Sequence, residues 1–62
     1  MPMTSREMIK LLEANGFYKV RSNGSHFFFR NDKTGKTTTV PRHTEDLKKG
    51  TEQKILKDAG LK

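Results

Sequence analysis

Apolar side chains recur at helical spacing near the start of the 62-residue chain. The residues that share one helical face are Met8, Leu11 and Leu12. The four residues that begin at Thr4 have the form of a capping box, in which a threonine and a glutamate three positions later accept from each other's backbone N–H groups. The pattern predicts a helix over residues 5–15, which Gly16 ends because glycine adopts the left-handed C′ conformation at little cost.

The middle of the chain changes to an alternation of period two, which is typical of strands. Three strands are predicted, over residues 17–21, 25–31 and 37–40. Asn23-Gly24 lies between the first two and indicates a hairpin, because both central residues of a type I′ turn need positive φ. A polar loop that contains Gly35 leads to the third strand, and Pro41 ends that strand.

A second helix is predicted after a polar connection over residues 42–50, whose one large apolar residue is Leu47. Thr51 is expected as its N-cap, and Gly60 is expected to end it at C′. Its apolar stripe is formed by Ile55, Leu56 and Ala59.

A three-stranded sheet with one apolar face needs a covering layer, and each helix has one apolar stripe to offer. We therefore expect a single α+β domain over residues 1–62, of order α-β-β-β-α, with an antiparallel sheet and both helices on one face. The residues expected to face the helices are Val20, Phe27, Phe29 and Val40. The opposite face would be open to solvent and would present Lys19, Arg21, His26, Phe28 and Arg30. This order of elements resembles a double-stranded RNA-binding domain (dsRBD).

The positive charge is concentrated in the middle third of the chain. Thirteen Lys and Arg against seven Asp and Glu give a net charge of +6. Residues 19–42 hold six of these cations against Asp32 alone. A basic patch of this kind indicates a polyanionic partner, through phosphate contacts and counterion release. A merely soluble basic surface is the alternative, and neither helix is basic along one face like a DNA-reading helix.

Several classes of protein are disfavoured by what the sequence lacks. There is no cysteine, which excludes disulfides and thiolate metal sites. The acidic residues are too scattered for a shared divalent-cation site, so we expect no metal and no cofactor. No apolar run is long enough for a signal peptide or a membrane span, so we expect a cytoplasmic protein without a membrane partner.

Four short motifs resemble the signature of the HicA toxin family, in a match that runs from about residue 4 to residue 61. They are Gly16-Phe17 with Arg21, Gly24-Ser25-His26 with Phe29, Val40-Pro41-Arg42-His43, and Gly50-Thr51 followed by Ile55-Leu56 and Ala59-Gly60-Leu61. The Gly-Ser-His motif alone would be a weak signal. Four motifs in the right order and at the right spacing are specific, and no motif position departs from the family pattern.

The resemblance implies the toxin of a type II toxin–antitoxin system with a dsRBD-like fold. It also implies an endoribonuclease (an mRNA interferase) that cleaves mRNA and inhibits translation, with His26 as a catalytic residue. A HicB-type antitoxin is implied as the partner that neutralises the toxin by covering this site. The alternative is a non-catalytic RNA-binding module of the dsRBD type.

The chemistry of His26 fits this expectation, because an imidazole titrates near neutral pH and serves as general acid or base. RNA supplies its own nucleophile, since a deprotonated 2′-OH attacks the adjacent phosphorus while nearby cations stabilise the developing charge. A surface histidine without a role is the alternative. One histidine serves poorly as both base and acid, and His43 is the other histidine of the chain. His43 is expected either to lie near the site or bind phosphate, or else only to cap its loop.

The remaining site residues are expected to bind RNA or to shape the site. The expected RNA-binding residues are Lys19, Arg21, Phe28, Arg30, Arg42 and His43. Arg21 and Arg30 flank His26 and are expected to clamp phosphates, with solvated surface charge as the alternative. Phe28 is expected to stack on a base or to anchor the antitoxin. Gly24 and Ser25 are expected to form the turn and the start of the strand, without a chemical step.

Overall fold

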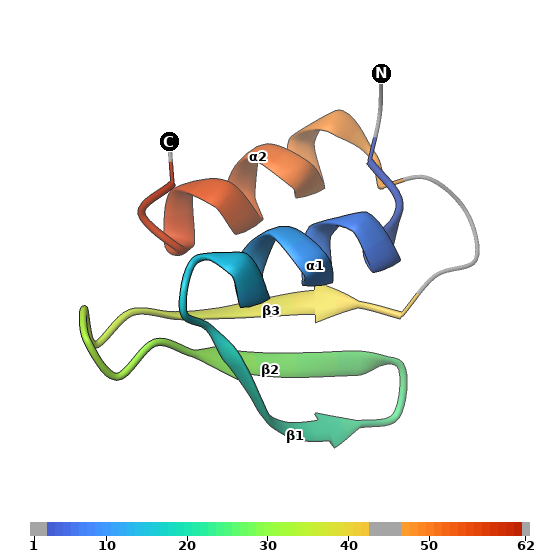
Figure 1. Cartoon of the computed structure of the whole chain (residues 1–62). Coiled ribbons are helices and arrows are strands. Elements are labelled where there is room, and N and C mark those ends of the chain that lie inside the picture. Colours follow the sequence, from blue (N-terminus) through green and yellow to red (C-terminus); the bar gives the residue numbers. More distant parts are fainter. Residues whose placement is uncertain (1–2, 43–46, 62) are drawn as a thin grey trace.

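The computed structural model describes residues 3–42 and 47–61 (Figure 1). Its elements are α1 (Ser5–Ala14), β1 (Tyr18–Asn23), β2 (His26–Arg30), β3 (Thr37–Pro41) and α2 (Lys49–Asp58). The strands form one antiparallel sheet in the order β1-β2-β3, and both helices lie on the same side of it (Figure 1). The predicted α+β fold, with its dsRBD-like order of elements, is confirmed.

The ends of α1 follow from local sequence. The Thr4 hydroxyl accepts from the Glu7 N–H at 3.1 Å, and the Glu7 carboxylate accepts from the Thr4 N–H at 2.9 Å, so the capping box is present. At the other end, Gly16 has φ +93° and the Phe17 N–H donates to the Leu12 carbonyl at 3.0 Å. The helix stops where the glycine was expected to stop it.

One core fills the space between the helices and the sheet. Its buried apolar residues are Met8, Leu12, Phe17, Phe29, Val40, Leu47, Ile55 and Ala59. Phe27 is partly buried against this core, so the inward orientation predicted for Phe27, Phe29 and Val40 is confirmed. All six residues of β1 are exposed.

A β-bulge in β1 changes which residues face the helices. Lys19 lies opposite the buried Phe29, whereas Arg21 lies opposite Phe28, so Val20 is the extra residue between two ladder positions. One inserted residue reverses the alternation of faces on either side of it. The predicted outward orientation of Lys19 is therefore wrong, because Lys19 lies on the helix side of the sheet. The predicted core position of Val20 is also wrong, because Val20 is 54% exposed.

The turn between β1 and β2 is one residue later than predicted. Asn23 pairs with His26, so the two-residue loop is Gly24-Ser25 and not Asn23-Gly24. Gly24 has φ +59°, while no described non-glycine residue has positive φ. A type I′ turn needs two such residues, so the turn fits type II′, which takes glycine first. The predicted strand start at Ser25 is wrong, because His26 is the first residue of β2.

The second helix begins at Lys49, so the prediction that Thr51 is its N-cap is wrong. Leu47 is buried, and its N–H donates to the Met3 carbonyl at 2.7 Å. The docking of Leu47 fixes where the chain enters the helix, because tertiary packing outweighs a capping preference of about 1 kcal/mol. Gly60 ends the helix as predicted, with φ +74°.

Candidate functional site

His26 is held in place by its neighbours in the sheet, although its own side chain is exposed. It lies directly after the Gly24-Ser25 turn, opposite Asn23 in β1 and opposite Pro41 in β3. The ladder continues past this pair, because the Arg42 N–H donates to the Ser25 carbonyl. The backbone on both sides of the imidazole is therefore fixed while the ring remains accessible.

His26 lines a hollow of about 420 Å³ at the β3 edge of the sheet, where the face away from the helices meets α2. The hollow is lined by His26, Thr39, Pro41, Thr51, Lys54, Ile55 and Asp58. The sequence did not single out Thr51, Lys54 or Asp58 as site residues. Their spacing of three and four positions places them on one face of α2, but the strand beside that face became known only from the fold.

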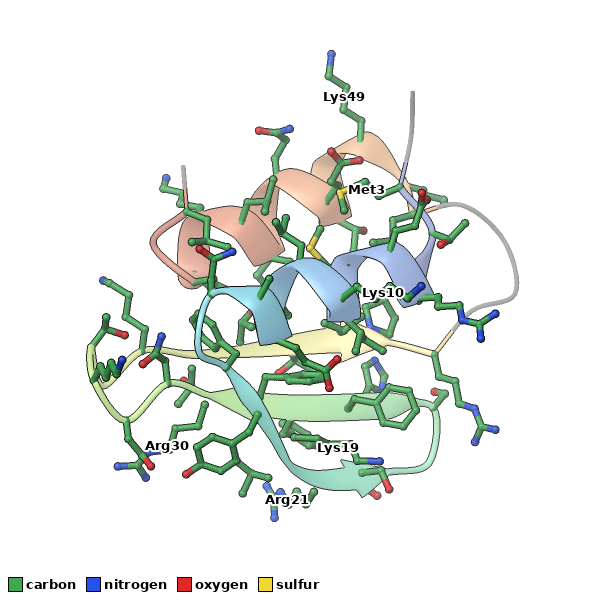
Figure 2. All side chains as sticks on the ribbon, viewed as in Figure 1. Met3, Lys10, Lys19, Arg21, Arg30 and Lys49 are labelled. Carbon is green, nitrogen blue, oxygen red and sulfur yellow. The ribbon has the colours of Figure 1, made fainter. Side chains whose placement is uncertain are left out.

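A smaller hollow of about 350 Å³ lies on the outer face of the sheet, away from the helices. It is lined by Val20, Arg21, Phe28, Phe29, Arg30, Thr37, Thr38 and Thr39. Thr39 lines both hollows, so the two adjoin. The Arg21 guanidinium lies over the Phe28 ring, with Cζ 4.7 Å from the ring centroid. Figure 2 shows Arg21 and Arg30 on the side of the sheet opposite to the helices, where they were predicted.

Arg30 and Tyr18 share one carboxylate at the far end of this face. The Nε atom of Arg30 lies 3.1 Å from Oδ1 of Asp32, and the Tyr18 hydroxyl donates to the same carboxylate at 3.1 Å. The hydrogen bond to Asp32 raises the pKa of the Tyr18 phenol above its ordinary value of 10.0. The Arg30 end of the outer face is thus partly neutralised, although the Nη donors of Arg30 are not used by this ion pair.

Lys19 and Arg42 lie around a different aromatic ring, on the helix side of the sheet. The Lys19 ammonium is 5.1 Å and the Arg42 guanidinium is 5.9 Å from the centroid of Phe27. Arg42 follows the buried Val40 by two positions and so returns to the same face. The structure therefore separates Lys19 and Arg42 from the face that carries His26.

Two other expectations meet the structure differently. His43 lies outside the described residues, so its expected place near the site stays a prediction. Gly24 and Ser25 form the turn itself, and Ser25 contributes its carbonyl to the ladder.

Within residues 3–42 and 47–61, no three His, Asp or Glu side chains are placed to hold a metal ion. No helix in the same ranges is long and apolar enough to cross a membrane.

The fold and the site define a class: a small α+β domain with dsRBD-like order, whose exposed histidine adjoins a basic, open sheet face. The family model for the HicA toxin of bacterial toxin–antitoxin systems matches residues 5–61. The chain therefore belongs to the HicA toxin family and is the toxin of a toxin–antitoxin pair, with an antitoxin as its partner. A search of curated proteins found no match.

Proposed function

We propose that this toxin is a metal-independent endoribonuclease that cleaves mRNA, with His26 as its general acid/base. His26 borders a hollow that one cationic side chain lines. A second hollow, which two cationic side chains line, adjoins the first. This arrangement is the observation that most supports the proposal. The cation of the first hollow is Lys54, and those of the second are Arg21 and Arg30. An exposed imidazole with cations on two sides is suited to a polyanionic chain that lies across it.

The reaction requires little from the protein beyond these groups. His26 removes the proton of a ribose 2′-OH, and the oxygen attacks the adjacent phosphorus. The bond from phosphorus to the 5′-oxygen breaks, which leaves a 2′,3′-cyclic phosphate on one product and, after protonation, a 5′-OH on the other. Cations around the phosphate stabilise the charge that develops on its oxygens.

The outer face of the sheet binds the RNA strand next to the cleaved bond. Arg21 and Arg30 contact phosphates, and Arg30 does so through the Nη donors that its ion pair with Asp32 leaves available. The pair of Arg21 and Phe28 offers a planar surface on which a base stacks, since both guanidinium and phenyl groups serve this purpose in RNA-binding proteins.

A HicB-type antitoxin neutralises the toxin by covering the same surface. Tyr18 is 45% exposed and Val20 is 54% exposed, and Val20 lies with Phe28 in the outer hollow. Exposed aromatic and apolar residues surrounded by charge are the usual anchors of protein interfaces. A partner that buries these side chains would also block the approach of RNA to His26.

The test is the cleavage of a defined RNA in EDTA by the wild type and by His26→Ala. The variant is expected to lose about 10²- to 10⁴-fold in rate while it retains RNA affinity. Asn23→Ala is the matched control, because Asn23 is exposed and lies opposite His26 in the ladder. The wild-type products should carry 2′,3′-cyclic phosphate ends.

Two outcomes would contradict the proposal in different ways. Binding without cleavage by the wild type, with or without divalent ions, would favour the non-catalytic RNA-binding module. Cleavage that EDTA abolishes and a divalent ion restores would overturn metal independence.

A further inference from the structure

We infer that Lys54 is the second catalytic residue: its ammonium group contacts the phosphate at the cleaved bond and gives a proton to the departing 5′-oxygen. The inference rests on the proposed ribonuclease function. In the balanced step, neutral His26 accepts the 2′-OH proton, the 2′-oxygen forms its bond to phosphorus, and the bond to the 5′-oxygen breaks as that oxygen takes a proton from Lys54. Exchange with water then returns both side chains to their starting states.

The geometry places Lys54 against the same space as the imidazole. His26 comes from β2 and Lys54 from α2, and both line the hollow of about 420 Å³. This volume falls within the range of about 300–1,000 Å³ that is usual for small-ligand sites, so it accommodates a phosphate and its flanking sugars. Thr39 and Thr51 line the same hollow, and each carries a hydroxyl group that can donate a hydrogen bond.

The direction of α2 favours Lys54 as the cation near His26. In Figure 1, α2 runs antiparallel to β3, so its first turns lie toward the Pro41 end of the strand. His26 pairs with Pro41 at that end. The carboxylate of Asp58 also lines the hollow, but it lies one helical turn beyond Lys54, in the direction away from His26. A phosphate is therefore favoured at the Lys54 end and disfavoured at the Asp58 end.

Lys54 is not engaged elsewhere in the described part of the chain. It is exposed, and it forms no ion pair within 4.0 Å with any residue in 3–42 or 47–61, including Asp58 at i+4. The ion pair that these residues do contain is that of Arg30 with Asp32, at the far end of the outer face. The ammonium is thus available to a substrate in the hollow.

The chemistry needs such a group. A 5′-alkoxide is a poor leaving group, and protonation by a positioned acid is worth about 10²- to 10⁴-fold in rate. His26 serves as the base in this scheme, so a different side chain must serve as the acid. Lys54 is the described cation that shares the hollow with it.

The test uses two RNA substrates that differ at one atom: the natural phosphodiester, and an analogue with sulfur in place of the 5′-bridging oxygen at the cleaved bond. A thiolate leaves without protonation, so the loss of a general acid slows only the natural substrate. Lys54→Met is expected to cleave natural RNA about 10²-fold more slowly and to lose much less rate on the sulfur analogue, where only the phosphate contact is missing. Lys54→Arg should be nearly as slow on natural RNA, because guanidinium is a weaker acid.

Lys57→Met is the matched control, because Lys57 is an exposed lysine of the same helix and does not line the hollow. This variant should cleave both substrates at the wild-type rate. A Lys54→Met protein with wild-type rates on natural RNA would overturn the inference, and so would an equal loss on both substrates. If His43→Ala cleaves natural RNA slowly but the sulfur analogue at the normal rate, and Lys54→Met does not show this difference, the general acid is His43 instead. A wild type that cleaves neither substrate would defeat the proposed function itself, which is a separate result.

Discussion

At the scale of single residues, Asp32 illustrates how one carboxylate determines the properties of two neighbours. It accepts the hydrogen bond of the Tyr18 hydroxyl and forms the ion pair with Arg30, which lies opposite Tyr18 in the ladder. The accepted hydrogen bond stabilises the neutral phenol and so raises the pKa of Tyr18. The contribution of this hydrogen bond to folding stability is fully present below the pKa of about 10 that tyrosine has in the unfolded chain. It is lost as the pH rises through the higher pKa of the folded state.

This shift is measurable without interference, because Tyr18 is the one tyrosine of the chain. We expect the ultraviolet absorbance of ionised phenol to give a titration midpoint above 10.0 in the wild type. Asp32→Ala should lower that midpoint, while Asp58→Ala should leave it unchanged. An identical midpoint in the wild type and in Asp32→Ala would show that the hydrogen bond does not persist in solution.

Asn31 shows what sequence patterns miss at this scale. It stands where the second predicted strand, over residues 25–31, meets the polar loop, yet it is 4% exposed, and its amide donates to the Asn15 carbonyl at 3.0 Å. Its side-chain oxygen accepts from the Lys33 N–H at 2.9 Å, so one residue joins the end of α1 to the loop before β3. Periodicity counts such a residue as polar and therefore exposed. Its burial depends on partners that are distant in sequence.

At the scale of elements, the Gly24-Ser25 turn fixes the first residue of β2 and therefore the position of His26. Gly24→Ala is expected to destabilise the protein by about 1–2 kcal/mol, because its φ of +59° is costly for a residue with a Cβ. An added Cβ at Gly24 would meet no atom within 4 Å, so the cost is one of backbone conformation alone. The measurement is the free energy of unfolding in urea.

Gly50→Ala is the matched control for this substitution. Gly50 also has open space around it, but it lies in α2 without positive φ, so alanine should raise stability by about 0.5 kcal/mol. The two substitutions are thus expected to change stability in opposite directions, so the control separates the positive φ of Gly24 from the mere addition of a methyl group. If Gly24→Ala is neutral, the turn does not have the described conformation.

The elements themselves were predictable, because each rests on local signals: the capping box, the glycines at the helix ends and the alternation of the strands. The bulge at Val20 was not, because no residue type marks it and its effect is seen only against Phe28 and Phe29 in the neighbouring strand. The start of α2 was missed for a related reason, since the buried Leu47 decided it. Register and docking are properties of pairs of elements.

At the scale of the whole molecule, cations lie on both sides of the sheet at the end that carries His26. Lys19 and Arg42 gather around Phe27 on the helix side, next to the ladder pair of His26 and Pro41. An RNA strand that continues beyond the hollows would bend around this end and contact both cations. Short RNA would not reach them.

We therefore expect the double variant Lys19→Met/Arg42→Met to raise the KM for long RNA and to leave cleavage of a short oligonucleotide unchanged. If each cation contacts one phosphate, the slope of log affinity against log salt should fall in magnitude by about 1.4. Lys10→Met/Lys33→Met is the control, because it removes the same charge from α1 and from the loop before β3. If both double variants lose affinity for long RNA equally, the effect comes from net charge and not from the positions of Lys19 and Arg42.

The candidate site was predictable only in part, because some of its residues are brought together by strand pattern and others by the packing of α2 against the sheet. His26, Phe28 and Arg30 share one face because strand alternation is a local rule that holds along β2, whereas Arg21 joins them because the register after the bulge pairs it with Phe28. Lys54 belongs to the hollow because α2 packs beside β3, where the Thr38 hydroxyl donates to the Ile55 carbonyl at 3.4 Å. Such a contribution follows from the tertiary fold and from no motif.

The end of β3 has a consequence for how a partner reaches His26. Pro41 has no N–H to offer, and its carbonyl already accepts from the Ser5 hydroxyl at 2.7 Å, while the Arg42 N–H is directed to Ser25 inside the sheet. A foreign strand that approached this edge would find at Pro41 neither a free donor nor an unused carbonyl to continue the ladder. Sheet extension, by an antitoxin or by a second copy of the toxin, is therefore disfavoured beside His26. We therefore expect a partner that covers His26 to do so through side-chain contacts and not by adding a strand at this edge.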